Sequence, residues 1–246
     1  MNAEIVGLVF LLDKQSYYLP VAHDYLDAPE QLSRQSVMKS LKPILESQVI
    51  GKIGQNLKYD AHVLANIGID LSGIVDDTMI KSYCLNSVAT RHNMDDLSEY
   101  YLGHKTIHYA DVAGSGKKQL TFNQVNIEEA LPYACEDVIV TYELNKILES
   151  KLQQFPKLMT LYRTLELPLV NIMLKLERNG ALIDEVSLFN QQVQIKSEMQ
   201  EIQTQAFEIA GDEFNLESPK QIQQILFSKE GLGLEPKKKT AKGQPS

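Results

Sequence analysis

The sequence predicts an α/β domain over residues 1–155, followed by an all-helical segment over residues 156–246. In the first part, short apolar runs typical of buried strands alternate with amphipathic helical patterns. Beyond Phe155 and Pro156 only the helical periodicity continues. The first two strands are predicted to form a hairpin, so the sheet of the α/β domain is expected to be mixed.

The strands are predicted from short apolar runs bounded by polar or turn residues. Residues 5–12, IVGLVFLL, predict a buried strand, and residues 17–21, YYLPV, predict its hairpin partner. Residues 50–54 predict a third strand, and a fourth begins the segment 73–86, GIVDDTMIKSYCLN. The same segment continues with an Asp/Thr cap and a helix.

The helices are predicted from capping residues and a 3.6-residue apolar period. Residues 104–125 are polar and predict a loop between two of these helices. One helix is predicted to begin at Ser33, a second to run from near Asp60 to Gly68, and a third to end at Gly103. Four more are predicted over residues 127–154, 158–178, 185–210 and part of 215–227.

Composition excludes several classes of protein. The 24 Lys and Arg against 32 Asp and Glu give a net charge of −8, which argues against a broad basic surface for duplex DNA. A local nucleic-acid site remains open, because carboxylates can bind metal ions that supply positive charge. Cys84 and Cys135 lack the spacing of a zinc site or disulfide framework, which favours a reducing compartment. We find neither a membrane-spanning apolar run nor a signal peptide.

The segment GQNLKYD, residues 54–60, places polar groups at the end of a predicted strand. Asn56 and Tyr59 beside Asp60 suit a cleft that binds phosphate or metal better than a core. The alternative is that Asp60 is the N-cap of the next helix. The residues alone leave both interpretations open.

The segment YACED, residues 133–137, places Tyr133 and Asp137 four residues apart on one face of a predicted helix. A carboxylate can hold a metal ion, and a tyrosine hydroxyl can orient a water for in-line attack on phosphorus. The alternative is a tyrosine packed on the sheet and an aspartate in solvent.

Two other motifs are less specific. In GSGKK, residues 114–118, the residues required for a phosphate-binding loop are not all present, because Lys118 stands where Ser or Thr is needed. We therefore reject an ATP-binding loop and predict a flexible one. Arg91 lies at a predicted helix entrance, where a phosphate contact and a surface position are equally open.

Several longer stretches together resemble one family. VAHDYLDAPEQ, KIGQNLKYDAHVLANIGI, DDTMIKSYCLNSVATRHNMDDLSEYYLGHKTI, GKKQLTFNQV and YACEDVIVTYEL are similar to the proofreading 3′–5′ exonuclease domain of the bacterial family A DNA polymerases, the DNA polymerase I family. LELPLVNIMLKLERNGALID and EFNLESPKQIQQILF resemble the start of the polymerase region, at the base of its thumb. The resemblance implies a ribonuclease H-like fold, with a mixed sheet between flanking helices.

The resemblance also implies roles for individual residues. Asp60 and Asp137 match metal-binding aspartates, and Tyr133 matches the tyrosine that orients the attacking water. Tyr109 falls where the family has an aromatic side chain near the terminal bases. The positions that match residues holding the single-stranded 3′ end are Gln55, Asn56, Tyr59 and Arg91.

The family's first motif, an Asp-x-Glu pair, lies on a strand shortly before the stretch that matches Val6-Gly7-Leu8. Because the sequence begins at Met1, we expect that strand and two of four carboxylates to be absent from the exonuclease domain, residues 1–155. The thumb-base segment, residues 156–246, is expected to lack the fingers and palm and thus the polymerase active site. The chain is therefore expected to be a fragment truncated at both ends.

The implied function is metal-dependent hydrolysis of 3′-terminal nucleotides during DNA replication and repair, impaired in the isolated chain. The implied cofactor is Mg²⁺ or Mn²⁺, with Zn²⁺ as an alternative. The implied partner is the single-stranded 3′ end of DNA in the bacterial cytoplasm and nucleoid, with no membrane and no obligate protein partner. The alternatives are a catalytically inactive single-stranded DNA-binding remnant and a non-functional gene fragment.

Overall fold

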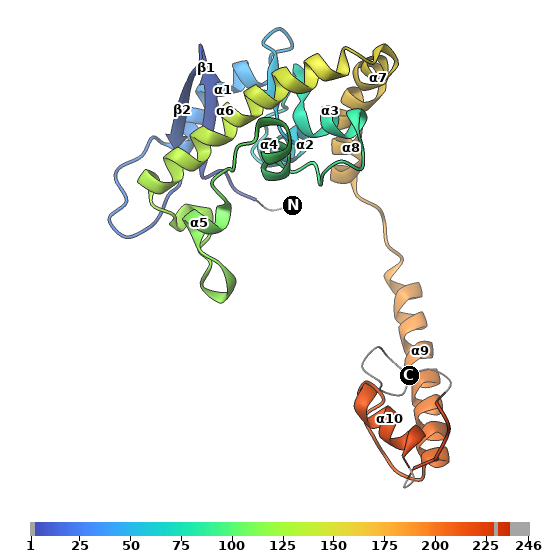
Figure 1. Cartoon of the computed structure of the whole chain (residues 1–246). Helices are drawn as coiled ribbons and strands as arrows, with labels where there is room; N and C mark the ends of the chain where they lie inside the picture. The colour runs from blue at the N-terminus through green and yellow to red at the C-terminus, as the bar shows by residue number, and fades with distance from the viewer. Residues whose placement is uncertain (1–2, 229–230, 237–246) are drawn as a thin grey trace. The chain divides into compact units, whose positions relative to one another are not determined.

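The computed structural model describes residues 3–228 and 231–236. The chain groups into two compact units, Met1–Gly180 and Ala181–Ser246, and Figure 1 shows the elements of each. Residues 156–180 thus group with the α/β elements by their contacts. The boundary predicted at residue 155 separates two segments by family resemblance and not by their contacts, and it stays a prediction.

A tight β-hairpin opens the first unit. Strand β1 (Gly7–Leu12) pairs antiparallel with β2 (Gln15–Pro20). The two turn residues, Asp13 and Lys14, have φ angles of 50° and 67°. Positive φ at both central positions is the geometry of a type I′ turn, whose twist matches that of the flanking strands. The predicted hairpin is confirmed, and its strand ends differ by two residues or fewer.

A second pair of strands is parallel. Strand β3 (Lys52–Gly54) pairs with β4 (Ile74–Asp77), and the connection between them contains α2 (Leu57–Ala65). The described strands form two separate two-stranded sheets, one antiparallel and one parallel. Helices flank these strands, and the predicted α/β class is confirmed. The two orientations occur in separate small sheets, whereas we predicted a single mixed sheet.

Helix α6 (Ile127–Leu152) connects the two sheets through side-chain packing. It packs against β1, β2 and β3 and against the helices α3 (Thr78–Leu85) and α4 (Met94–Leu102), and it crosses the unit in Figure 1. Its side chains Leu144, Leu148 and Leu152 are fully buried. Burying one leucine contributes about 1.5–3 kcal/mol to folding. The helix begins after the cap Asn126 and continues through Pro132.

The shorter helices of the first unit follow their caps. Ser33 precedes α1, Asp77 caps α3, and Asn93 and Gly103 bound α4. Ser33, the Asp/Thr cap and Gly103 are residues from which helix ends were predicted. The bounds are Arg34–Leu45 for α1, Thr78–Leu85 for α3 and Met94–Leu102 for α4.

The stretch 104–125, predicted as a loop, contains short helices. They are α5 (Tyr109–Ala113) and the 3₁₀ turns Gly116–Lys118 and Phe122–Gln124. Capping boxes close the first and last of the three, formed by His108 with Asp111 and by Thr121 with Gln124. These local hydrogen bonds satisfy backbone N–H groups at the starts of the helices, which have no acceptor within a helix of any length.

The predicted helix 158–178 is three pieces. They are α7 (Pro156–Leu161), a π-helical turn (Tyr162–Glu166) and α8 (Leu167–Asn179). Pro168 lies two residues after the last residue of the π-helical turn, and it has no N–H to donate to the preceding turn of helix. Widening of the helix at this point is the local response, and such turns are often found at functional sites.

The second unit contains two helices in its described part. Helix α9 (Glu185–Ala210) has the predicted bounds, with Asp184 as its cap and Gly211 after its end at φ 71°. Helix α10 (Pro219–Phe227) follows the cap Ser218. Within residues 3–228 and 231–236, none of the helices is long and apolar enough to cross a membrane.

Candidate functional site

The carboxyl ends of β3 and β4 meet at one edge, because the strands are parallel and Gly54 pairs with Asp77. Asn56, two residues after the end of β3, adopts a left-handed conformation with φ 58°, which asparagine tolerates better than most residues. This turn leads the chain directly from the strand into α2. Residues 55–60, which we call the strand-end segment, thereby lie beside Asp77.

Asp77 is fully buried and accepts backbone N–H groups from two helices. It caps α3 through Met79 at 3.0 Å and Ile80 at 3.3 Å. It also accepts from Asn56 at 3.2 Å and Leu57 at 2.7 Å. Burial raises the pKa of Asp77, and the four N–H donors oppose that shift. The α3 cap was predicted from the sequence, whereas its link to the strand-end segment was not.

Gln55 connects the strand-end segment to the entrance of α4. Its Nε2 donates to the carbonyl of His92 at 2.9 Å, and its Oε1 accepts from the hydroxyl of Thr78. Arg91, the neighbour of His92, is exposed, and its backbone N–H donates to Asp96 at 3.4 Å. The structure therefore brings together two segments that were predicted separately as contacts of a nucleic acid.

Asp60 lies in the first turn of α2, after the N-cap Asn56. The alternative that Asp60 itself caps the helix is therefore wrong, and the helix begins three residues earlier than predicted. Asp60 is exposed at its surface, as is its neighbour Tyr59. Although the residue as a whole is exposed, loss of hydration around its carboxyl group raises the pKa of Asp60 to about 6; a backbone hydrogen bond opposes this shift and the charge of Asp77 reinforces it.

Tyr133 and Asp137 both lie partly buried on α6. Desolvation, together with the charges of Glu136 and Asp95, raises the pKa of Asp137 to about 7. Desolvation and then the charge of Asp137 raise the pKa of Tyr133 to about 12. The two side chains thus share an environment, as their spacing predicted, and Asp137 is not simply in solvent.

An aromatic cluster surrounds Tyr133. Its ring centroid lies 6.4 Å from that of Tyr109 and 5.9 Å from that of Phe122, and the latter two are 6.3 Å apart. The hydroxyl of Tyr109 donates to the carbonyl of Leu120 at 3.1 Å. The three rings come from α5, a 3₁₀ turn and α6. Tyr109 and Tyr133 were predicted as site residues from separate segments, and Phe122 was missed.

The two predicted metal-binding carboxylates have different acidic neighbours. The charge of Asp77 contributes to the raised pKa of Asp60, whereas the charges of Glu136 and Asp95 contribute to the raised pKa of Asp137. Across residues 3–228 and 231–236, no group of three or more His, Cys, Asp or Glu side chains lies close enough to hold a metal ion. The oxygen donors of Asp60 and Asp137 match the ligands that Mg²⁺ and Mn²⁺ prefer.

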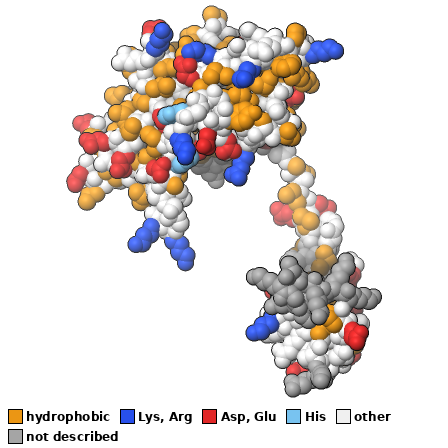
Figure 2. Space-filling model, in the orientation of Figure 1, with side chains coloured by type: hydrophobic (Ala, Val, Ile, Leu, Met, Phe, Trp, Pro, Cys, Tyr) orange, Lys and Arg blue, Asp and Glu red, His pale blue; other side chains and the backbone are white. Residues whose placement is uncertain are grey.

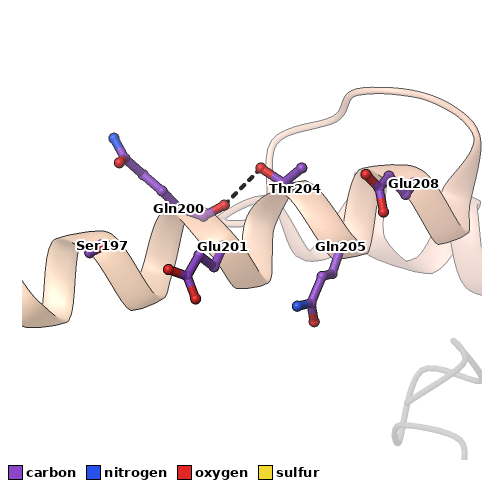
Figure 3. Close-up of a pocket in the computed structure, with 6 residues that line it drawn as sticks. All are labelled: Ser197, Gln200, Glu201, Thr204, Gln205 and Glu208. Carbon is purple, nitrogen blue, oxygen red and sulfur yellow. Dashed lines mark hydrogen bonds between the residues drawn. The ribbon is translucent and has the colours of Figure 1, made fainter.

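The hollows of the described surface include one in each unit. One, of about 190 Å³, is mostly apolar and adjoins the strand-end segment at the starts of α2 and α3 and along α8; it is lined by Asn56, Lys58, Asp77, Met79, Ile80, Glu166, Leu169, Val170 and Met173. The other, of about 460 Å³, lies along α9 in the second unit. Figure 3 shows that its side chains, mainly Gln and Glu, come from one helix. We assign no chemistry to this second hollow.

The surface supports a local site rather than a broad basic field. On the face in Figure 2, acidic, basic and apolar side chains are interspersed. Carboxylates, a tyrosine on the same helical face as one of them, and an aromatic cluster within an α/β fold are together typical of carboxylate-dependent nucleases.

Comparisons with known proteins identify the family within that class. A family profile described as 3′–5′ exonuclease matches residues 3–153, and one described as DNA polymerase family A matches residues 185–246. The chain therefore belongs to the 3′–5′ exonuclease family, as its resemblance predicted. Members of this family in DNA polymerase I depend on divalent metal ions.

Curated relatives align along the whole chain. The chain is 48% identical to a DNA polymerase I from Pseudomonas aeruginosa over 248 residues, covering 100% of the chain and 27% of the relative. It is 35% identical to a DNA polymerase I from Rhizobium leguminosarum, covering 100% of the chain and 26% of that relative. The chain spans about a quarter of the length of these relatives. The predicted identification as an exonuclease region followed by the start of a polymerase region is confirmed.

A solved structure shows the same fold. The POL domain of Pol1 from M. smegmatis, in complex with DNA primer-template and dNTP, superposes with a TM-score of 0.71. The superposition covers 97% of this chain and 36% of that one, at 22% sequence identity. This similarity supports the assigned fold.

Proposed function

We propose that this chain binds the single-stranded 3′ end of DNA and contributes Asp60, Asp137 and Tyr133 to hydrolysis of the terminal nucleotide. A DNA substrate would place this work at the bacterial nucleoid. The contacts proposed for the strand are the side chains of Gln55, Asn56, Tyr59, Arg91 and Tyr109.

The observation that supports this proposal best is the pairing of Tyr133 with Asp137 beside Tyr109 and Phe122. Stacking of bases on aromatic rings accounts for much of the binding of single strands, and it needs no broad basic surface. A carboxylate one helical turn from the ring of Tyr133 would then lie close to the terminal phosphodiester. Asn56 and the exposed Arg91 supply polar contacts for the phosphates.

Asp60 and Asp137 would hold the divalent metal ion, with Mg²⁺ or Mn²⁺ proposed and Zn²⁺ as the alternative. The metal would supply Lewis-acid stabilisation of charge on the phosphodiester oxygens. Tyr133 keeps its proton at neutral pH, because its pKa is about 12. Its hydroxyl therefore orients the attacking water by hydrogen bonding and does not remove a proton from it.

Two carboxylates are fewer than the four that the family resemblance implies. We therefore expect the 246-residue polypeptide alone to release 3′ nucleotides slowly or not at all. Each 1.36 kcal/mol of lost transition-state stabilisation lowers a rate about tenfold. We expect activity to appear in a chimera in which a strand carrying the Asp-x-Glu motif of the resembled family is fused ahead of residue 1.

The test measures nucleotide release from a 3′-labelled single strand in Mg²⁺ and in Mn²⁺. Asp60→Asn and Asp137→Asn should each abolish release by the chimera, whereas Asp13→Asn, in the exposed hairpin turn, should not change it. Rapid release by the polypeptide without the graft, lost in Asp137→Asn, would show that other ligands complete the site. An inactive chimera that still binds single strands would favour a binding role instead.

A further inference from the structure

A buried hydroxyl from the π-helical turn contacts the strand end. Tyr162 is fully buried. Its hydroxyl oxygen accepts the backbone N–H of Asp77 at 3.0 Å and donates to Oδ1 of Asp76 at 3.1 Å. Tyr162 lies beyond residues 3–153, which match the exonuclease family. The last residues of β4 are thus held by a segment that follows the exonuclease match.

Charged side chains fix the π-helical turn in place. Asp76 pairs with Lys81 at 2.8 Å and with Arg163 at 2.8 Å. Both cations also pair with Glu149 of α6, at 2.5 Å and 3.1 Å. Lys81 is fully buried, so these carboxylate partners offset the cost of burying a charged side chain. The network restrains Tyr162, because Arg163 is the next residue in the chain.

The same residues lead to the strand-end segment. The backbone of Asp77 donates to Tyr162, while its carboxylate accepts the N–H groups of Asn56 and Leu57. Those two amides begin the turn that presents Tyr59 and Asp60. A displacement of Asp77 would therefore change the geometry of the turn, because a buried carboxylate must keep its N–H donors.

We propose that Tyr162 and Asp77 are positioning residues for DNA binding by the strand-end segment, residues 55–60. The segment that follows the exonuclease match would thereby act as a support for the exonuclease site. Neither side chain needs to touch the DNA. This inference rests on the proposed function, since it assigns the purpose of the contact to binding of a single strand.

The variant Tyr162→Phe tests the contact with little change in packing. It removes the hydroxyl, leaving the N–H of Asp77 without its acceptor. Tyr17→Phe is the matched control, because the hydroxyl of Tyr17 donates to Gln15 at 2.9 Å on the exposed hairpin. Asp77→Asn is a second variant, in which the side-chain NH₂ group replaces an oxygen that accepts N–H groups and should weaken the same turn.

Two measurements follow on the 246-residue chain. Hydrogen exchange in peptides covering residues 54–60 should be about threefold to tenfold faster in Tyr162→Phe, the effect of losing one buried hydrogen bond. Exchange in the hairpin, residues 7–20, should not change. The Kd for a short fluorescent oligo-dT should rise about threefold to tenfold in Tyr162→Phe and not in Tyr17→Phe.

Each contrary result has a distinct meaning. Equal acceleration of exchange in residues 7–20 and 54–60 would show general destabilisation and overturn the positioning role. Wild-type binding that is unchanged in both Tyr162→Phe and Asp77→Asn would also overturn it. A wild-type chain that fails to bind oligo-dT overturns the proposed function itself, and the wild-type titration alone identifies that case.

Discussion

Tyr133 and Asp137 lie one helical turn apart on α6, and the charge of Asp137, after desolvation, raises the pKa of Tyr133 to about 12. At neutral pH the phenol is therefore protonated and neutral. A neutral hydroxyl can donate one hydrogen bond and accept others, so it can position a water but cannot act as a general base. This relationship separates the proposed orienting role from proton abstraction.

Tyr133→Phe should lower nucleotide release by the chimera about tenfold to a hundredfold, the scale of a misplaced reactant. The oligo-dT affinity should change little, because the ring remains in the cluster with Tyr109 and Phe122. The measurement is single-turnover release as a function of pH. Titration of the phenol as a base would make the wild-type rate rise steeply towards pH 10, which would contradict the orienting role.

Asp137→Asn should stabilise the metal-free chain at pH 8. The pKa of Asp137 is raised to about 7 in the folded state, above the unfolded value of about 3.9. Between these values the folded state binds more protons, so stability falls as pH rises through the window. Removing the charge should raise the free energy of unfolding at pH 8 by about 1–2 kcal/mol, a value discounted because the side chain is partly exposed.

Urea unfolding at pH 4 and pH 8 measures this effect, with EDTA present. The difference between wild type and Asp137→Asn should be small at pH 4, where the carboxyl group is largely protonated in the folded protein. Asp13→Asn, in the exposed turn, is the control for a carboxyl-to-amide change. Equal stability of wild type and Asp137→Asn at pH 8 would mean that burial of Asp137 costs nothing.

Local features of the sequence predicted much of the fold. The end of α4 at Gly103 and the bounds of α9, residues 185–210, could both be predicted, because a cap acts on N–H or C=O groups within a few residues. The pairing of Tyr133 with Asp137 follows from the period of the helix alone. The short helices in residues 104–125 were missed although their capping boxes are also local.

Contacts between distant segments could not be predicted from local patterns. Asp77 forms hydrogen bonds with Leu57, 20 residues earlier in the sequence, and with Tyr162, 85 residues later. Phe122 joins the aromatic cluster only because the 3₁₀ turn folds onto α6. Asp60 lies in the first turn of α2 because the left-handed Asn56 starts the helix early, and the N–H groups of Asn56 and Leu57 hold that turn through the distant carboxylate of Asp77. Packing of whole elements determines these relationships.

Arg91→Ala should weaken binding of oligo-dT and lower its dependence on salt. Arg91 is exposed beside His92, whose carbonyl accepts from Gln55, so its guanidinium is free to reach a phosphate. Loss of one phosphate contact lowers the slope of log K against log salt by about 0.7 for a single strand. Titrations at several salt concentrations measure the slope.

The matched control is Arg34→Ala, because Arg34 pairs with Glu4 at 3.0 Å near the start of α1 and has no proposed part in the site. Its slope should equal that of the wild type. Identical slopes for Arg91→Ala and Arg34→Ala would remove Arg91 from the proposed phosphate contacts. A preference for blunt duplex over oligo-dT would contradict the single-strand site as a whole.

Lys81→Met should destabilise the chain by about 3–5 kcal/mol, the cost of removing one partner from a buried ion pair. Lys81 is fully buried and contacts Asp76, Glu149 and the Oδ1 of Asn145 at 2.7 Å. Methionine has a similar length but cannot satisfy these oxygens. The two carboxylates would then share only Arg163 as a cationic partner within the described network.

Urea unfolding at pH 7 measures the loss, and Lys146→Met is the matched control. Lys146 pairs with Glu143 at 2.8 Å on the exposed face of α6, where an ion pair has little effect on stability.

Burial alone would raise the pKa of Glu149, but the hydrogen bond and charge of Lys81, with the charge of Arg163, lower it. The network therefore adds stability above the unfolded pKa of glutamate, about 4.3, and loses it as pH falls through the lower folded value. Lys81→Met should consequently show a smaller loss of stability on acidification than the wild type, and an unchanged acid profile would show that the Lys81–Glu149 pair does not set the pKa of Glu149.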